Sequence, residues 1–215
     1  MPKLAYIIYL AVLLFSVSSG VSRYTQLNKP SKLIVIYLAI TFLVESIAIG
    51  IAFFHKNPNN LFLYHVYSPA QFLFMCLYFS YSDKHKFIRK IGWILAFLGI
   101  VASVVNTILL QPITELNTNF IVLESFLAIG MSLFAFYKLL ASDIIDVHLN
   151  PRFWFSSIFL VFWSFTFFYW LVGVTIYNLM PDKAFWLNAM ILFINIAAYS
   201  GFGVVFLLYK KMKTA

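Results

Sequence analysis

Residues 33–54 read LIVIYLAITFLVESIAIGIAFF, a run of 22 residues in which Glu45 is the only charged side chain. A helix needs about 20 mostly apolar residues to cross the hydrocarbon core of a bilayer. Strands of a membrane β-barrel alternate apolar and polar residues over about ten positions, whereas this run is continuous over about twice that length. The segment therefore predicts a transmembrane helix.

Six further apolar runs have the same character, and connections that contain Pro, Asn or Asp separate them. The seven predicted spans are residues 4–20, 33–54, 61–81, 91–110, 119–141, 153–179 and 184–209. No stretch is left over for a water-soluble domain. We therefore expect residues 1–215 to form a single all-α domain, a polytopic bundle of seven transmembrane helices.

The composition of the whole chain supports a membrane protein. Of its 215 residues, 63% are hydrophobic and 10% are charged, whereas an ordinary soluble domain has roughly 25% charged residues. A soluble fold of this size could not bury so much apolar surface, and disorder requires low hydrophobicity. The net charge of +8 lies in short connections, which favours topology signals and contacts with anionic lipid over nucleic-acid binding.

The basic residues predict the orientation of the chain. Lys3, Lys56 and Lys183 fall on one side of the predicted bundle, and the other twelve Lys and Arg residues fall on the opposite side. Because cytoplasmic loops carry the excess of Lys and Arg, we expect the N-terminus outside and the C-terminus in the cytoplasm, in the plasma (inner) membrane. Residues 4–20 also imitate a signal peptide, but cleavage would leave Arg23 and the following lysines outside.

Several side chains inside the predicted spans are polar, and they fall in the outer half of the membrane or near its midplane. Helical spacing places Tyr64, Ser68 and Gln71 in one stripe. We hypothesise that these side chains line a polar cavity, walled by aromatic rings, that a small ligand or water fills. The predicted ligand-binding residues are Glu45, Tyr64, His65, Gln71, Asn106, Glu124, Trp170 and Asn188.

Each of these residues also has a structural interpretation. Asn and Gln side chains often hold membrane helices together through hydrogen bonds. Glu45 and Glu124 are also consistent with neutral carboxylic acids bonded across helices, because an isolated charge is costly in hydrocarbon, although a site or proton path is slightly preferred for them. Aromatic stripes more often pack than bind.

The sequence lacks the motifs of several membrane functions. The last predicted span has no central Lys for a retinal Schiff base, and no nucleophile elbow or phosphate-binding loop is present. His65 has no second histidine at zinc-binding spacing. Only Pro69 lies inside a span, unlike the pattern of small sugar transporters. We therefore predict no catalytic residue, no metal site and no cofactor.

A set of motifs resembles a family of short, uncharacterised seven-helix bacterial membrane proteins. The motifs are Leu63-Tyr64-His65, Pro69-x-Gln71, Asn106, Gln111, Asn117-Thr118, Glu124-Ser125 and Pro151-x-Phe153-Trp154. The resemblance covers the third to sixth spans, about half of the chain. That family more often has an acid where Gln71 stands and Ser where Thr118 stands, so this chain departs from the family at a position where acid-dependent chemistry would need the acid. The family has no assigned activity, so the resemblance implies a fold and no function.

Three functions remain, in order of preference. The first is a receptor or sensor that binds a small molecule from outside and signals through a cytoplasmic partner, which would dock on the basic segments from Lys84 to Lys90 and from Lys210 to Lys213. Lipid contacts explain these segments equally well. The second is a transporter or channel with Glu45 and Glu124 as proton or cation sites. The third is an intramembrane enzyme that uses His65 with one of these acids.

Overall fold

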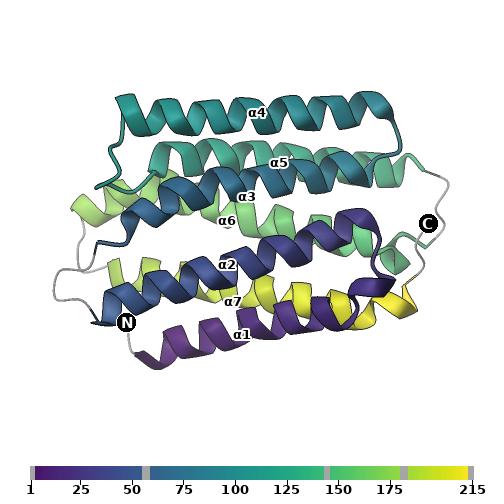
Figure 1. Ribbon diagram of the computed structural model, residues 1–215, viewed down its shortest axis with the longest axis horizontal. Coiled ribbons are helices and arrows are strands. Elements are labelled where there is room, and N and C mark those ends of the chain that lie inside the picture. The colour runs from purple at the N-terminus through teal and green to yellow at the C-terminus, as the bar shows by residue number, and fades with distance from the viewer. Residues whose placement is uncertain (1–2, 55–58, 143–145, 180–183, 213–215) are drawn as a thin grey trace. The chain divides into compact units, whose positions relative to one another are not determined.

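The computed structural model describes residues 3–54, 59–142, 146–179 and 184–212, and the described residues are almost entirely helical, with no strand among them (Figure 1). Lys56, Lys183 and Lys213, which were counted above, lie outside these ranges. The α-helices are α1 (Lys3–Ser22), α2 (Lys29–Phe54), α3 (Leu61–Ser82), α4 (Lys86–Leu109), α5 (Thr118–Leu140), α6 (Pro151–Leu179) and α7 (Ala184–Leu208). Short 3₁₀ helices are η1 (Tyr24–Gln26), η2 (Val147–Leu149) and η4 (Tyr209–Lys211). The all-helical fold is confirmed.

Asparagine side chains begin two of the helices. The Asn28 Oδ1 atom accepts a hydrogen bond of 3.0 Å from the Ser31 amide, and Asn150 Oδ1 accepts one of 3.0 Å from the Arg152 amide. These bonds satisfy amides that have no partner within the helix. Each asparagine lies within two residues of a proline that fits a first helical turn. Two of the predicted breaks between spans are therefore helix starts that an asparagine side chain caps.

The chain divides into two compact units, and the division falls inside α5. Unit 1 comprises Met1–Gln26 and Ser125–Ala215, and unit 2 comprises Leu27–Glu124. In unit 1, α7 packs against both α1 and α6, and Figure 1 shows α1 running beside α7. Small residues permit the close approach of α1 and α7: the Ser16 hydroxyl donates to the Tyr199 carbonyl, and Gly203 faces the ring of Phe15.

Unit 2 is built around α3, which packs against α2 and α4. Eleven of the 22 residues of α3 are buried. The other six helices contain stretches long and apolar enough to cross a membrane, and α3 is not among them. A helix covered by neighbouring helices can carry polar side chains that would be costly against lipid. The seventh span therefore stays a prediction, while six are supported by length and hydropathy.

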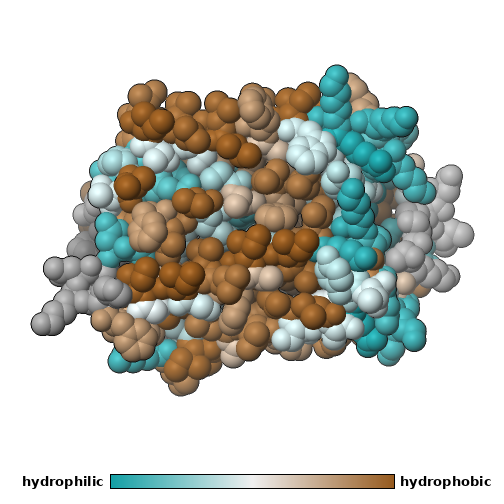
Figure 2. All heavy atoms as spheres, viewed as in Figure 1, coloured by the Kyte–Doolittle hydropathy of each residue, from teal (hydrophilic) through white to brown (hydrophobic). Residues whose placement is uncertain are grey.

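The two faces of α4 differ sharply. Gly92, Ala96, Gly99 and Ser103 are buried at helical spacing, and a Cβ atom added at Gly92 would lie 2.5 Å from the Ser80 Cβ of α3. The opposite face is apolar and exposed, and Figure 2 shows it as a brown band that gives way to hydrophilic residues where α4 begins. This distribution fits a helix with protein on one side and hydrocarbon on the other.

Candidate functional site

Buried polar side chains are concentrated in unit 2. Several of them, together with half-buried and exposed partners, form two groups, which we call the α4–α5 network and the Glu124 cluster. The α4–α5 network consists of His65, Asn106, Thr107, Gln111, Asn117, Thr118 and Asn119. The Glu124 cluster consists of Tyr37, Thr41, Tyr67, Gln71 and Glu124. The two groups contain four of the eight predicted ligand-binding residues.

Carboxamide side chains organise the α4–α5 network. The Asn106 Nδ2 atom donates to Asn117 Oδ1 at 2.6 Å and to Gln111 Oε1 at 3.2 Å, and Asn106 Oδ1 accepts from Asn119 Nδ2 at 3.3 Å. Gln111 Nε2 donates to the Thr118 hydroxyl at 2.6 Å, and Gln111 Oε1 accepts from the Asn119 amide at 2.9 Å. The network ties the end of α4 to the start of α5.

His65 joins α3 to the same region. Its Nδ1 atom lies 2.8 Å from the Thr107 hydroxyl, and its Nε2 atom lies 2.9 Å from the Glu115 carbonyl oxygen. Because a carbonyl oxygen only accepts, Nε2 carries a proton. Both ring nitrogens are therefore engaged by the protein, which favours a structural role for His65.

Hydroxyl and amide groups of α2 and α3 meet in the Glu124 cluster. The Gln71 Nε2 atom donates to the Tyr37 hydroxyl at 2.9 Å. The hydroxyls of Thr41 and Tyr67 are 2.8 Å apart, and both residues also interact with the Tyr37 hydroxyl. All of these side chains except Glu124 come in pairs at i, i+4 spacing: Tyr37 with Thr41, and Tyr67 with Gln71.

Glu124 is the buried carboxyl of this cluster. Only 1% of its surface is exposed, and its Oε1 atom accepts no hydrogen bond from the described residues. The carboxyl lies within electrostatic range of the Tyr37 hydroxyl and of the buried Cys76 thiol. A buried carboxyl oxygen without a donor is unfavourable, because it has lost its hydrogen bonds to water. A polar group from outside the chain that bonded to this atom would satisfy it.

A second buried polar atom without a partner lies near the start of α5. Asn117 is fully buried, and its Nδ2 atom donates no hydrogen bond to the described residues. Asn117 and Glu124 are seven residues apart, which is two helical turns or roughly 10 Å along a helix axis. Asn117, just before α5, and Glu124, in its second turn, are thus two buried polar groups near the same end of the helix.

The other predicted residues are placed as follows. Glu45 is half-buried on α2. Tyr64 is half-buried on α3, and its ring lies edge-on to Tyr67 with the ring centres 6.5 Å apart. In unit 1, Asn188 Oδ1 accepts a 2.8 Å hydrogen bond from the hydroxyl of Tyr169, whose ring lies 4.8 Å from that of Trp170. Tyr169 and Asn188 therefore link α6 to α7 in unit 1, and Trp170 lies beside Tyr169.

Several residues of the site were missed by the sequence analysis. Tyr37, Thr41, Tyr67 and Thr107 are absent from the predicted residues, although the i, i+4 pairs of α2 and α3 are visible in the sequence. Among the described residues, no three His, Cys, Asp or Glu side chains converge where they could hold a metal ion.

Comparisons with protein-family models, with curated proteins and with solved structures found no match.

Proposed function

We propose that this chain is a multi-pass membrane protein that binds a small polar molecule at the Glu124 cluster and acts as a receptor or sensor. The ligand enters from the outer side, and binding is passed to a cytoplasmic partner. The observation that carries the proposal is the buried Glu124 Oε1 atom, which has no donor among the described residues.

The polar side chains grouped around Tyr37, which lies within electrostatic range of Glu124, suit the recognition of a polar molecule. Ligand sites in proteins are largely apolar and place a few polar groups that fix orientation. The Glu124 cluster offers tyrosine rings together with hydroxyl and carboxamide groups. A ligand hydroxyl or amino group that donates to Glu124 would relieve a buried acceptor, which is worth about 1–3 kcal/mol.

The rest of α3 favours a receptor over a transporter. Beyond Gln71, toward the end of α3 that carries Tyr81, the next fully buried side chains are Phe72, Met75 and Cys76. These apolar groups interrupt the line of polar residues that begins at His65. A transporter requires a polar path that reaches both faces of the membrane, whereas a receptor requires only a site open to one face.

The substitution Glu124→Gln tests the proposal. It keeps the size of the side chain and removes its capacity to carry a negative charge. We expect the variant to fold, with its thermal unfolding in detergent close to that of the wild type. We expect small molecules that co-purify with the wild-type protein, identified by mass spectrometry after denaturation, to be lost from the variant.

The matched control is Glu115→Gln, at an exposed carboxyl just before α5. We expect this variant to retain whatever the wild type retains. Identical small-molecule content in the wild type and in Glu124→Gln would contradict a ligand at the Glu124 cluster. Proton uptake into proteoliposomes that depends on Glu124 would overturn the receptor and would favour a proton-coupled transporter.

A further inference from the structure

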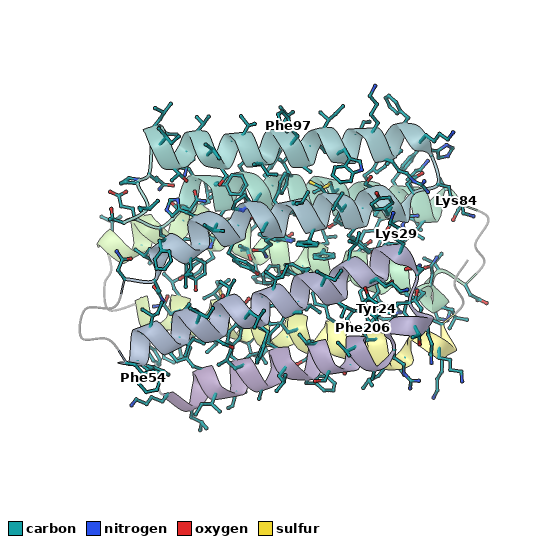
Figure 3. The ribbon with its side chains drawn as sticks, in the orientation of Figure 1. Tyr24, Lys29, Phe54, Lys84, Phe97 and Phe206 are labelled. Atoms are coloured by element: carbon teal, nitrogen blue, oxygen red, sulfur yellow. The ribbon has the colours of Figure 1, made fainter. Side chains whose placement is uncertain are left out.

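The ends of three helices meet at one end of unit 2. Lys29 begins α2, Ser82 ends α3 and Lys86 begins α4. Figure 3 shows Lys29 and Lys84 at this end, opposite Phe54 at the other end of α2. Basic side chains from two separate segments are therefore brought to the same end of the unit.

Two basic side chains at this end, Lys29 and Arg89, lie near the same aromatic ring, that of Tyr81. The Lys29 Nζ atom lies 3.7 Å from the centre of the Tyr81 ring, and the Arg89 guanidinium carbon lies 5.9 Å from it. The Arg89 Nε atom donates to the Asp83 carbonyl at 3.3 Å, which orients the guanidinium. The face of an aromatic ring attracts a cation, so the fold holds both positive charges close together.

The surroundings add more positive than negative charge, since Asp83, which is buried and accepts a 2.8 Å hydrogen bond from the His85 amide, is the acidic residue of this connection. Lys84, Lys86 and Lys90 are exposed in the same connection and in the first turns of α4. Like charges gathered at a surface repel one another, and a bound anion would relieve this repulsion. The arrangement is therefore suited to an anionic group.

The basic residues border directly on exposed apolar side chains of α4. Phe87 is 71% exposed and Trp93 is 50% exposed, and Ile94 beside them is 47% exposed. If α4 crosses the membrane, these side chains face acyl chains while Lys29 and Arg89 lie at the level of the headgroups. A ligand that contacts both the basic residues and the exposed apolar side chains must combine a negative headgroup with hydrocarbon chains.

We propose that Lys29, Tyr81 and Arg89 form a binding site for the phosphate of an anionic phospholipid. The first turns of α4 contact its acyl chains. The site is distinct from the Glu124 cluster and does not depend on what that cluster binds. The basic residues could instead bind an acidic surface of a cytoplasmic protein. Such a partner would not explain why Phe87 and Trp93 are exposed beside them.

The test is native mass spectrometry of the full-length protein in detergent micelles that contain equal amounts of phosphatidylglycerol and phosphatidylcholine. We expect the wild type to retain phosphatidylglycerol selectively. The double variant Lys29→Gln/Arg89→Gln should bind it roughly thirty-fold more weakly, since each basic residue near an anionic lipid contributes about a five-fold gain in affinity. The control is Lys210→Gln/Lys211→Gln, two lysines that follow α7 in unit 1, and it should retain the lipid.

Three outcomes would overturn the proposal. Equal retention of the two lipids would show that no anionic site exists. An equal loss in both double variants would show that only general surface charge attracts the lipid. Binding of a poly-glutamate peptide that depends on Lys29 and Arg89, without selection for phosphatidylglycerol, would assign the surface to a protein partner. Thermal unfolding of each variant shows whether a loss of lipid comes from a loss of fold.

Discussion

His65 lies where α3, α4 and the connection after α4 meet. Each of its ring nitrogens is close to a partner from a different part of unit 2, Thr107 on α4 and the carbonyl of Glu115. Hydrogen bonds between membrane helices contribute on average about 0.6 kcal/mol each. A side chain that makes two of them fixes the position of α3 relative to the end of α4.

We therefore expect His65→Phe to destabilise the protein by about 1–2 kcal/mol, because it removes two hydrogen bonds and leaves the Glu115 carbonyl without its donor. Reversible unfolding in mixed detergent micelles measures the loss. Combining His65→Phe with Thr107→Val closes a double-mutant cycle, in which we expect a coupling energy of about 0.5–1.5 kcal/mol. Strict additivity of the two substitutions would contradict the contact.

The identity of the polar residues was predictable, but their partners were not. Hydropathy singles out Glu124 and Gln71 because polar groups are rare in spans. It does not separate Tyr37 or Tyr67 from the many other tyrosines of the chain, since a tyrosine hydroxyl is equally common in packing and at surfaces. Nor does a sequence show that His65 bonds to a backbone carbonyl fifty residues away.

The packing of α3 against α4 depends on small residues along one face of α4. At Gly92 an added Cβ atom would meet the Ser80 Cβ atom at 2.5 Å and the Cys76 carbonyl oxygen at 3.2 Å. Both atoms are held by the backbone of α3, so they can move away only if the helix moves. At Gly130 on α5, an added Cβ atom would meet no described atom within 4 Å.

These two glycines give a matched pair of substitutions. We expect Gly92→Ala to destabilise the protein by about 1–3 kcal/mol through overpacking. We expect Gly130→Ala to be neutral or to stabilise it by up to about 1 kcal/mol, because alanine is the better helix former. Thermal unfolding of the two variants checks both expectations, and equal effects would show that α3 and α4 are not in tight contact.

The existence of each helix followed from hydropathy, while some of the helix starts did not. The α2 and α4 helices begin at Lys29 and Lys86, before the apolar runs predicted from residues 33 and 91. Lysine is a good helix former, so the first turns are helical although they are not apolar. Conversely, α3 is long enough to cross a bilayer but more polar than the other helices, because its polar side chains face protein within unit 2.

The orientation of the whole chain rests on the uneven distribution of its basic residues. In the described part of the chain, the connection between α3 and α4 carries Lys84, and the first turn of α4 carries Lys86 and Arg89. Positive residues in short loops remain in the cytoplasm. Our prediction therefore places this connection and the C-terminus inside the cell.

Reporter fusions test this orientation. A fluorescent protein fused after Ala215 should fluoresce, because it folds in the cytoplasm, whereas alkaline phosphatase at the same position should be inactive. Phosphatase activity from a C-terminal fusion would reverse the predicted orientation. It would also place Lys29 and Arg89 on the outer surface.

Unit 1 is built from two segments of the chain that unit 2 separates. The Ser16 hydroxyl bonds to a backbone carbonyl 183 positions later, at Tyr199. A growing polypeptide therefore releases α1 from the ribosome first and its packing partner α7 last. Until α7 has been synthesised, α1 lacks its packing partner and is surrounded by lipid or by the insertion machinery. By then α2, α3 and α4 can already pack against one another.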